Sequence, residues 1–323
     1  MSEYNLRSAA AIGTGLMGPG TALTLALGGL ETTIVSRDAD RAAAAAQKAR
    51  ALAHFLAANE LIDESAAAGA AQRLTGSADF DEAIAAADIV IESALEDMAL
   101  KQQLFARMDG LNPRAILATN TSALSITQIA SGCTRPERVL TTHFWNPPHL
   151  IPLVEIVQGE RTSPAAADAV HRLLRSCGKT PVTVRKDRRG QIGNRLQMAL
   201  VREAVNIVAE GIADAHDVDT VIRDGLGIRM PAYGTLEHMD VAGLDLALSI
   251  NDYVVADLYN EPRAPETLRQ LVRSGNLGVK TGRGFYDWST RSADAVKAAR
   301  DAFLVEVLRY RRGLQSRQTN CLR

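Results

Sequence analysis

The feature that most constrains the fold is a glycine-rich turn between an apolar segment and a helical one near the N-terminus. Residues 9–12 (Ala-Ala-Ala-Ile) have the character of a buried strand, Gly13-Thr-Gly-Leu-Met-Gly18 follows at once, and residues 21–27 form an apolar helical run. A strand, G-x-G-x-x-G and a helix in this order are typical of the phosphate-binding turn of a dinucleotide-binding sheet. We therefore expect the chain to begin with a Rossmann-like unit. A glycine-rich turn without a ligand is the alternative.

Each position in this turn has an expected task. Gly13 permits the tight bend, Gly15 lets a pyrophosphate approach the backbone, and Gly18 lets the helix pack closely on the strand. Leu16 and Met17 complete the turn and are expected beside the cofactor. The helix N-terminus that follows offers free N–H groups and the positive end of its dipole to the phosphates.

The second strand ends where such a fold reads the adenosine ribose. Residues 32–35 (Thr-Thr-Ile-Val) are the strand candidate, and Ser36 and Arg37 follow them. An acidic residue here favours NAD, because its charge repels the 2′-phosphate of NADP. Ser36 removes that repulsion and Arg37 can pair with phosphate, whereas Asp38, two residues later, would restore an NAD site. We therefore expect NAD or NADP as the cofactor, and we expect NADP to be accepted.

Strand and helix patterns alternate through the first part of the chain. Further strand candidates lie at residues 88–92, 115–118, 139–143, 153–157 and 180–184, with helical patterns at 39–60, 63–74, 101–108 and 164–177. This alternation predicts an α/β fold with a doubly wound, mostly parallel sheet over residues 1–186.

Only helical patterns follow that part of the chain. They lie at residues 194–210, 218–226, 246–258, 265–273 and 293–311. Residues 187–323 are therefore expected to form an all-α second domain. The basic, polar tail after Arg309 is expected to fray.

One histidine and one glutamate stand out in the strand patterns. His143 ends an apolar run, and Pro147-Pro148 prevents a helix directly after it. Glu155 is the only charge in residues 153–157, and a buried carboxylate needs a partner. A chain that turns at the prolines and re-enters the sheet brings Glu155 beside His143, a pair suited to general acid–base catalysis. The alternative is two buried polar residues that only satisfy each other.

Other polar residues follow predicted strands or begin a predicted helix. Ligands of doubly wound sheets bind at the carboxyl ends of the strands. Glu92, Ser122 and His143 all lie at or just past such ends. Ser122 has the alternative role of capping the helix after it. Asn194, near the start of the first helix of the second domain, is a candidate to reach a ligand.

Composition excludes several classes of function. Hydrophobic residues make up 46% and charged residues 23%, and the net charge is −1, so we expect a soluble globular protein with no nucleic-acid partner. Cys133, Cys177 and Cys321 are widely separated, which indicates no disulfide framework, no metal site and a reducing, cytoplasmic location. No signal peptide is recognised, and the apolar run 23–30 is too short to span a membrane.

These motifs, in their order and spacing, resemble those of the 3-hydroxyacyl-CoA dehydrogenase family. The likeness extends from about Arg7 to Trp288 and rests on residues 13–20, Thr119-Asn-Thr-Ser122, His143-Phe-Trp-Asn-Pro147, Leu153-Val-Glu155, Asn194-Arg195, Val241-Ala-Gly-Leu-Asp245 and Lys280-Thr-Gly-Arg-Gly-Phe-Tyr286. The resemblance implies a Rossmann-like N-terminal domain, a helical C-terminal domain that commonly makes a homodimer, and a substrate cleft between the two.

The resemblance also implies roles for individual residues. His143 looks like the general acid/base with Glu155 as its partner, and Ser122 and Asn194 look like the residues that hold the substrate oxygen. Three further positions resemble those that line the family's cofactor site: Glu96, Lys101 and Asn146. The implied reaction is hydride transfer between a nicotinamide cofactor and the 3-hydroxy or 3-keto group of a short-chain 3-hydroxyacyl-CoA.

Departures from the family's pattern leave the substrate open. The family often has Pro-Gly-Phe where this chain has Arg189-Gly-Gln191, and Gly-Pro where it has Tyr233-Gly-Thr235. Family lysines between the second and third strands help to hold the nucleotide end of coenzyme A, but residues 55–64 contain no lysine. The same chemistry on a free hydroxy acid or sugar acid is therefore an alternative. A cofactor-binding protein without turnover is a lesser one, because the four catalytic candidates are intact.

Overall fold

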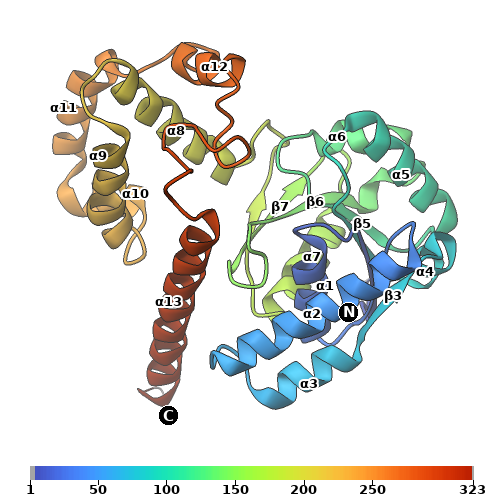
Figure 1. Ribbon diagram of the computed structural model, residues 1–323. Coiled ribbons are helices and arrows are strands. Elements are labelled where there is room, and N and C mark those ends of the chain that lie inside the picture. Colours follow the sequence, from blue (N-terminus) through green and yellow to red (C-terminus); the bar gives the residue numbers. More distant parts are fainter. Residues whose placement is uncertain (1–3, 322–323) are drawn as a thin grey trace. The chain divides into compact units, whose positions relative to one another are not determined.

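The chain folds into two compact units (Figure 1). The structure is a computed structural model that describes residues 4–321, with side chains described up to residue 313. The first unit runs to Asn194 and also includes the described residues from Ala299 on, and the second is Arg195–Ala298. The division thus falls after the boundary expected at residue 186, and the last helix groups with the first unit, which the sequence patterns did not predict.

An eight-stranded sheet forms the centre of the first unit. Its strand order is β3-β2-β1-β4-β5-β6-β7-β8. Strands β1 to β6 run parallel, β7 is antiparallel to β6, and β8 is parallel to β7. The doubly wound, mostly parallel sheet predicted from the sequence is confirmed. The strand bounds are β1 Ser8–Ile12, β2 Glu31–Val35, β3 Leu74–Ser77, β4 Ile89–Glu92, β5 Ile116–Thr119, β6 Val139–Phe144, β7 Leu153–Gln158 and β8 Thr180–Val184.

Helices cover both faces of the sheet. In β4, Ile89 and Ile91 pack in a cluster with helices α1 and α7, while Val90 between them packs in a second cluster with α4, α5 and α6. Because both faces are buried, the central strands are almost continuously apolar. The helices of this unit are α1 Gly18–Leu27, α2 Ala39–Ala58, α3 Glu64–Gln72, α4 Phe80–Ala86, α5 Met98–Leu111, α6 Ile126–Ile129 and α7 Pro164–Ser176.

Helices α2 and α3 pack against α1 through small side chains. Ala45, Ala49 and Ala53 of α2 are almost fully buried, and alanine at this spacing lets neighbouring helices approach closely. Helix α13 (Ala293–Cys321) adds Val305 to the same cluster. The expectation that the chain frays after Arg309 is wrong as far as Cys321, because α13 continues to that residue.

The second unit is helical, as predicted. Its helices are α8 Gly193–Ala209, which begins in the first unit, α9 Ala215–Thr220, a π-helical turn at Val221–Gly227, α10 Thr235–Ala242, α11 Leu244–Val254 and α12 Glu266–Arg273. Apolar side chains on α10 and α11 are largely exposed in the single chain, at 81% for Val241 and 87% for Tyr253. No helix within residues 4–321 is both long and apolar enough to cross a membrane.

Candidate active site

The glycine-rich turn connects β1 to α1. Gly13 has φ of +112°, which favours glycine, and a Cβ there would lie 2.7 Å from the carbonyl oxygen of Ser93. A Cβ at Gly18 would overlap the carbonyl oxygen of Gly13. At Gly15, in contrast, a Cβ would meet nothing within 4 Å. Packing explains the glycines at 13 and 18 but not the one at Gly15, where a backbone without a side chain would suit the close approach of a ligand.

The N-terminus of α1 is open to an anion. No side chain caps the helix at Met17, and its first turn contains no acidic residue. The N–H groups that begin the helix are therefore available to a phosphate. Leu16 is 68% exposed in the turn, while Met17 is partly buried against the core. These residues fit a dinucleotide pyrophosphate.

The end of β2 carries the residues expected to read the ribose. Ser36 follows the strand directly, and its N–H donates to the carbonyl oxygen of Ser77 at 3.1 Å. Asp38 caps helix α2, because its Oδ1 accepts the N–H of Arg41 at 2.8 Å. Arg37 is exposed and has no polar partner among the residues whose side chains are described. Asp38 is thus engaged as a helix cap, and Ser36 remains at the predicted ribose position.

His143 and Glu155 face each other across the antiparallel pair β6 and β7. The two residues are partners in the strand register, and His143 Nδ1 lies 2.9 Å from Glu155 Oε2. Only 4% of His143 and 1% of Glu155 is exposed. The turn at the prolines therefore returns the chain in the register that makes this pair.

Four donors converge on the carboxylate of Glu155. His143 Nδ1 and Trp145 Nε1 approach Oε2, and the N–H groups of Ile192 and Gly193 donate to Oε1 at 2.9 and 3.0 Å. Burial alone raises the pKa of Glu155, but these hydrogen bonds outweigh it and hold the pKa below its usual value. In the neutral imidazole, the ionised carboxylate holds the proton of His143 on Nδ1, so that Nε2 is the nitrogen with a free lone pair.

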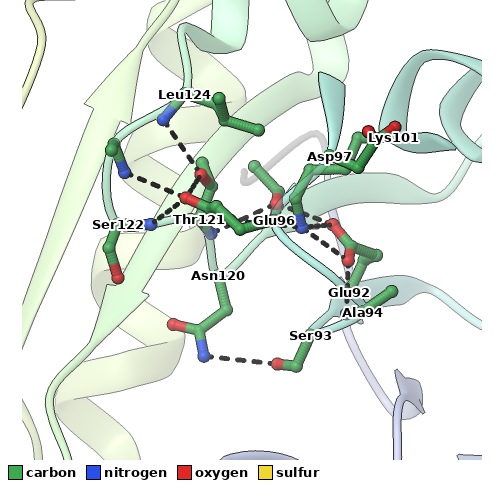
Figure 2. Close-up of polar contacts among 12 residues, drawn as sticks. Glu92, Ser93, Ala94, Glu96, Asp97, Lys101, Asn120, Thr121, Ser122 and Leu124 are labelled. Atoms are coloured by element: carbon green, nitrogen blue, oxygen red, sulfur yellow. Dashed lines mark hydrogen bonds and ion pairs between the residues drawn. The ribbon is translucent and has the colours of Figure 1, made fainter. Parts of the chain in front are cut away.

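Glu96 holds the turn that carries Ser122 (Figure 2). Its Oε1 accepts hydrogen bonds from the hydroxyl of Thr121 and from the N–H groups of Ser122 and Ala123, the latter two at 3.1 Å. Helix α6 is capped by Ser125, not by Ser122. The hydroxyl of Ser122 has no partner among the described side chains and main chain, so the helix-cap alternative does not account for it.

The segment from Gln191 to Asn194 links the Ser122 turn to Glu155. Asn194 Nδ2 donates to the carbonyl oxygen of Ser122 at 2.8 Å, and Gln191 Nε2 donates to that of Thr121 at 3.0 Å. The N–H groups on Glu155 come from the two residues between them. All four catalytic candidates are therefore joined through this segment.

Gln191 is one of the residues of this site to which the sequence analysis assigned no role. It is 5% exposed and has φ of +54°, which is uncommon for a residue other than glycine. Its Oε1 is buried with no hydrogen-bond partner among the described atoms. The sequence did mark this position, because Arg189-Gly-Gln191 stands where the family often has Pro-Gly-Phe. It did not indicate that Gln191 contacts the main chain of Thr121.

Lys101 lies with Glu92 across Glu96 from the Ser122 turn (Figure 2). It is 1% exposed, and its Nζ is 2.8 and 2.9 Å from the two carboxylate oxygens of Glu92, which is itself fully buried. Thr119 donates to the same carboxylate at 2.7 Å. Lys101 is also 3.8 Å from Glu96 Oε2. The lysine therefore supports the strand ends below the Ser122 turn, while Asn146, the last of the expected cofactor residues, is exposed after β6.

Fold and site together define a nicotinamide-dependent dehydrogenase. The turn at Gly15 and the open N-terminus of α1 suit a dinucleotide, and the buried imidazole–carboxylate pair suits proton transfer from a hydroxyl group. The family model for the NAD-binding domain of 3-hydroxyacyl-CoA dehydrogenase matches residues 8–188, and the model for the C-terminal domain matches residues 190–288. The chain belongs to the 3-hydroxyacyl-CoA dehydrogenase family and uses NAD.

Similar proteins act on more than one kind of substrate. The chain is 35% identical over 315 residues to a 5-formyl-3-hydroxy-2-methylpyridine 4-carboxylate 5-dehydrogenase of Mesorhizobium japonicum. The aligned region covers 95% of this chain and 99% of that protein. A crystal structure of a dehydrogenase of that name, described as an NAD+-dependent dismutase, has a TM-score of 0.86 at 34% identity over 95% of this chain and 98% of the other. A probable 3-hydroxybutyryl-CoA dehydrogenase of Bacillus subtilis is 41% identical over 209 residues, 64% of this chain and 71% of that protein.

Proposed function

We propose that this protein is an NAD-dependent dehydrogenase that acts on the hydroxyl group of a small free carboxylate rather than on a coenzyme A thioester. The observation that carries this proposal is the turn between α2 and α3, where the family's lysines help to hold coenzyme A. The corresponding residues here contain Glu60, Asp63 and Glu64 and no lysine. These positions therefore offer no lysine to pair with a phosphate-rich handle.

The same turn is covered by helix α13. Arg309 Nε donates to the carbonyl oxygen of Asn59 at 2.8 Å, and Arg312 donates to that of Glu60 at 2.8 Å. Arg312 also pairs with Asp63 at 2.7 Å. Arg309 and Arg312 thus direct hydrogen-bond donors at the turn itself. The match over nearly the whole chain to a dehydrogenase named for a pyridine carboxylate supports the same proposal.

The residues of the site would share the chemistry as follows. NAD supplies the hydride acceptor. His143 takes the hydroxyl proton at Nε2, and the ionised Glu155 stabilises the imidazolium that results. The hydroxyl of Ser122 and the second amide N–H of Asn194 steady the substrate oxygen while its charge changes.

A panel of substrates tests the choice between free acid and thioester. The purified protein is assayed with NAD against 3-hydroxybutyryl-CoA, free 3-hydroxybutyrate, sugar acids and hydroxymethylpyridine carboxylates, followed by NADH absorbance. We expect kcat/KM for at least one free acid to exceed that for the thioester by about tenfold or more, the effect of one misplaced charge contact. A micromolar KM for 3-hydroxybutyryl-CoA with no active free acid would establish the second candidate.

That second candidate is a short-chain 3-hydroxyacyl-CoA dehydrogenase of fatty acid metabolism. It is favoured by the family models over residues 8–288 and by the similarity to a probable 3-hydroxybutyryl-CoA dehydrogenase. Both candidates use the same cofactor and the same proton transfer, so the assay above separates them by substrate alone.

The choice between NAD and NADP is tested at Ser36. We expect the native protein to accept NADP as well as NAD, because no carboxylate at the end of β2 repels the 2′-phosphate and Asp38 is used as the cap of α2. Ser36→Asp is expected to raise the ratio of kcat/KM for NAD to that for NADP by about tenfold or more. Asp38→Asn is the matched control and should leave the ratio close to the native value. If the native protein ignores NADP and Ser36→Asp changes nothing, another residue reads the ribose.

We further propose that the protein is a homodimer and that it is located in the cytoplasm. The exposed apolar side chains of α10 and α11, such as Leu236, Val241 and Tyr253, suit burial against a second copy. Cys133 and Cys177 are free and buried, which agrees with a reducing compartment. A monomer in sedimentation equilibrium at micromolar concentration would contradict the dimer.

A further inference from the structure

A cavity in the first unit lies beside the α2–α3 turn. Its volume is about 400 Å³, and α1, the α2–α3 turn, the loops at residues 149–152 and 177–180, and α13 all contribute to its wall. None of the four catalytic candidates lines it. A volume of this order is typical of sites that hold one small organic molecule.

Most of the cavity wall is apolar. Leu23 and Leu27 come from α1, Leu56 from the end of α2, Leu61 from the turn that follows, and Leu308 from α13. All five leucines belong to or pack against one hydrophobic cluster. The cavity can therefore hold a hydrocarbon chain or ring without losing hydrogen bonds.

The charged groups of the wall are cationic. Lys179, Arg311 and Arg312 line the cavity, and no carboxylate does so among the described lining residues. Arg312 is paired with Asp63, but Arg311 has no polar partner among the described residues. Among the described residues, Nζ of Lys179 donates to the carbonyl oxygens of Pro148 at 2.5 Å and Ile151 at 3.0 Å. Two cations of the cavity therefore have no counter-ion.

Lys179 is half-buried in the cavity wall. An ammonium donates three hydrogen bonds, and two carbonyl oxygens leave one proton of Lys179 without an acceptor among the described residues. Burial without a carboxylate lowers the pKa of Lys179 to about 8. A bound anion would supply both the missing acceptor and the missing charge.

We propose that this cavity is a second binding site, for an aliphatic monocarboxylate of medium length. Its carboxylate pairs with Lys179 and Arg311, and its hydrocarbon chain lies against the leucines of α1 and α13. A neutral molecule of the same shape would leave both cations unpaired, and a short acid such as acetate would leave the apolar wall uncovered. The proposal does not depend on which substrate the dehydrogenase uses.

Isothermal titration of the full-length protein with octanoate tests the proposal. We expect octanoate to bind saturably with 1:1 stoichiometry. We expect 1-octanol, which lacks the carboxylate, and acetate, which lacks the hydrocarbon chain, each to bind at least about tenfold more weakly. Arg311→Gln and Leu308→Trp, the second of which fills the cavity, are expected to weaken octanoate binding by about tenfold or more. Glu306→Gln, on the same helix but outside the cavity wall, is the matched control and should bind octanoate normally.

Proton uptake gives a second readout. Because an anion raises the pKa of Lys179, binding at a pH of about 8.5 should take up protons, so that the measured enthalpy varies with the ionisation enthalpy of the buffer. Lys179→Met should abolish this dependence. Two titratable groups lie near Lys179: burial raises the pKa of Cys177 to about 12, and burial and Lys179 lower the pKa of His149 to about 4. Three further charged groups lie near His149: Lys48, Arg300 and Asp301. None of those with a resolved pKa shift would titrate at that pH.

Several outcomes would overturn the proposal. They are absence of octanoate binding, equal affinity for 1-octanol, native affinity in both Arg311→Gln and Leu308→Trp, and competition of octanoate with NAD or with the dehydrogenase substrate. Competition would show that the cavity belongs to the active site. Since turnover is measured separately with the panel of substrates, failure of the carboxylate site and failure of the proposed dehydrogenase function give different results.

Discussion

Replacing His143 with alanine or glutamine is expected to lower kcat by about 10²–10⁴, the range for loss of a general acid or base, while NAD still binds. The imidazole is 4% exposed, and its Nδ1 is held by Glu155, so Nε2 is the nitrogen left to take the hydroxyl proton. Neither replacement accepts a proton near neutral pH. The glycine turn that suits NAD lies on β1 and α1 and does not include this residue.

Two measurements distinguish a catalytic loss from a folding loss. Steady-state kcat is compared with the dissociation constant for NAD from titration, and far-ultraviolet circular dichroism checks the fold. His143→Gln is the conservative member of the pair, because glutamine retains a hydrogen-bonding side chain opposite Glu155. Turnover within a few-fold of the native rate in both variants would exclude His143 as the general acid/base.

Glu155→Gln should impair the same step through the tautomer of His143. Four donors meet the carboxylate of Glu155, and a carboxamide offers only one acceptor oxygen to them. If the amide N–H₂ turns towards His143, Nδ1 becomes the acceptor and the proton moves to Nε2, which can then no longer take one from a substrate. We expect kcat to fall by at least about tenfold. An unchanged kcat would mean that the pair only fills the core.

The sequence predicted the elements whose signals are local. The fingerprint at residues 13–18 and the Pro147-Pro148 turn gave the dinucleotide fold and the pairing of His143 with Glu155, and the structure has both. Strand β3 was missed, because Leu-Thr-Gly-Ser is short and polar and its pairing with β2 is decided by tertiary contact. The end of α13 was missed because a basic, polar tail gives no helix signal of its own.

The residues that hold the catalytic groups in place were harder to predict from the sequence than the catalytic groups themselves. Trp145 and Gln191 act by hydrogen bonds to Glu155 and to the main chain of Thr121, across 10 and 70 residues of sequence. No periodicity connects such positions. The N–H groups of Ile192 and Gly193 carry no side-chain signal at all, yet they supply half of the hydrogen bonds to the central carboxylate. The residue types in the sequence therefore indicated the kind of reaction, whereas the backbone N–H groups that hold Glu155 could be found only in the structure.

Lys101 shows where a resemblance and the physical environment point to different roles. The resemblance places it among cofactor-lining residues, but its ammonium is 1% exposed and bound to both oxygens of Glu92. A buried pair of this kind contributes little when compared with an apolar pair, but loss of one member leaves a buried charge without compensation. We therefore propose that Lys101 acts on the cofactor site only through Glu92 and Glu96.

Lys101→Met is accordingly expected to destabilise the protein by about 3–5 kcal/mol, seen as a lower urea midpoint, because it leaves the carboxylate of Glu92 buried and unpaired. The double variant Lys101→Met/Glu92→Gln removes the stranded charge but keeps an acceptor for the hydroxyl of Thr119, so it should recover at least about half of the lost stability. Lys297→Met, which removes an exposed lysine paired with Asp294, should change the midpoint very little. If Lys101→Met instead raises KM for NAD at native stability, the lysine contacts the cofactor directly, and the open surface for that contact must arise when the cofactor binds.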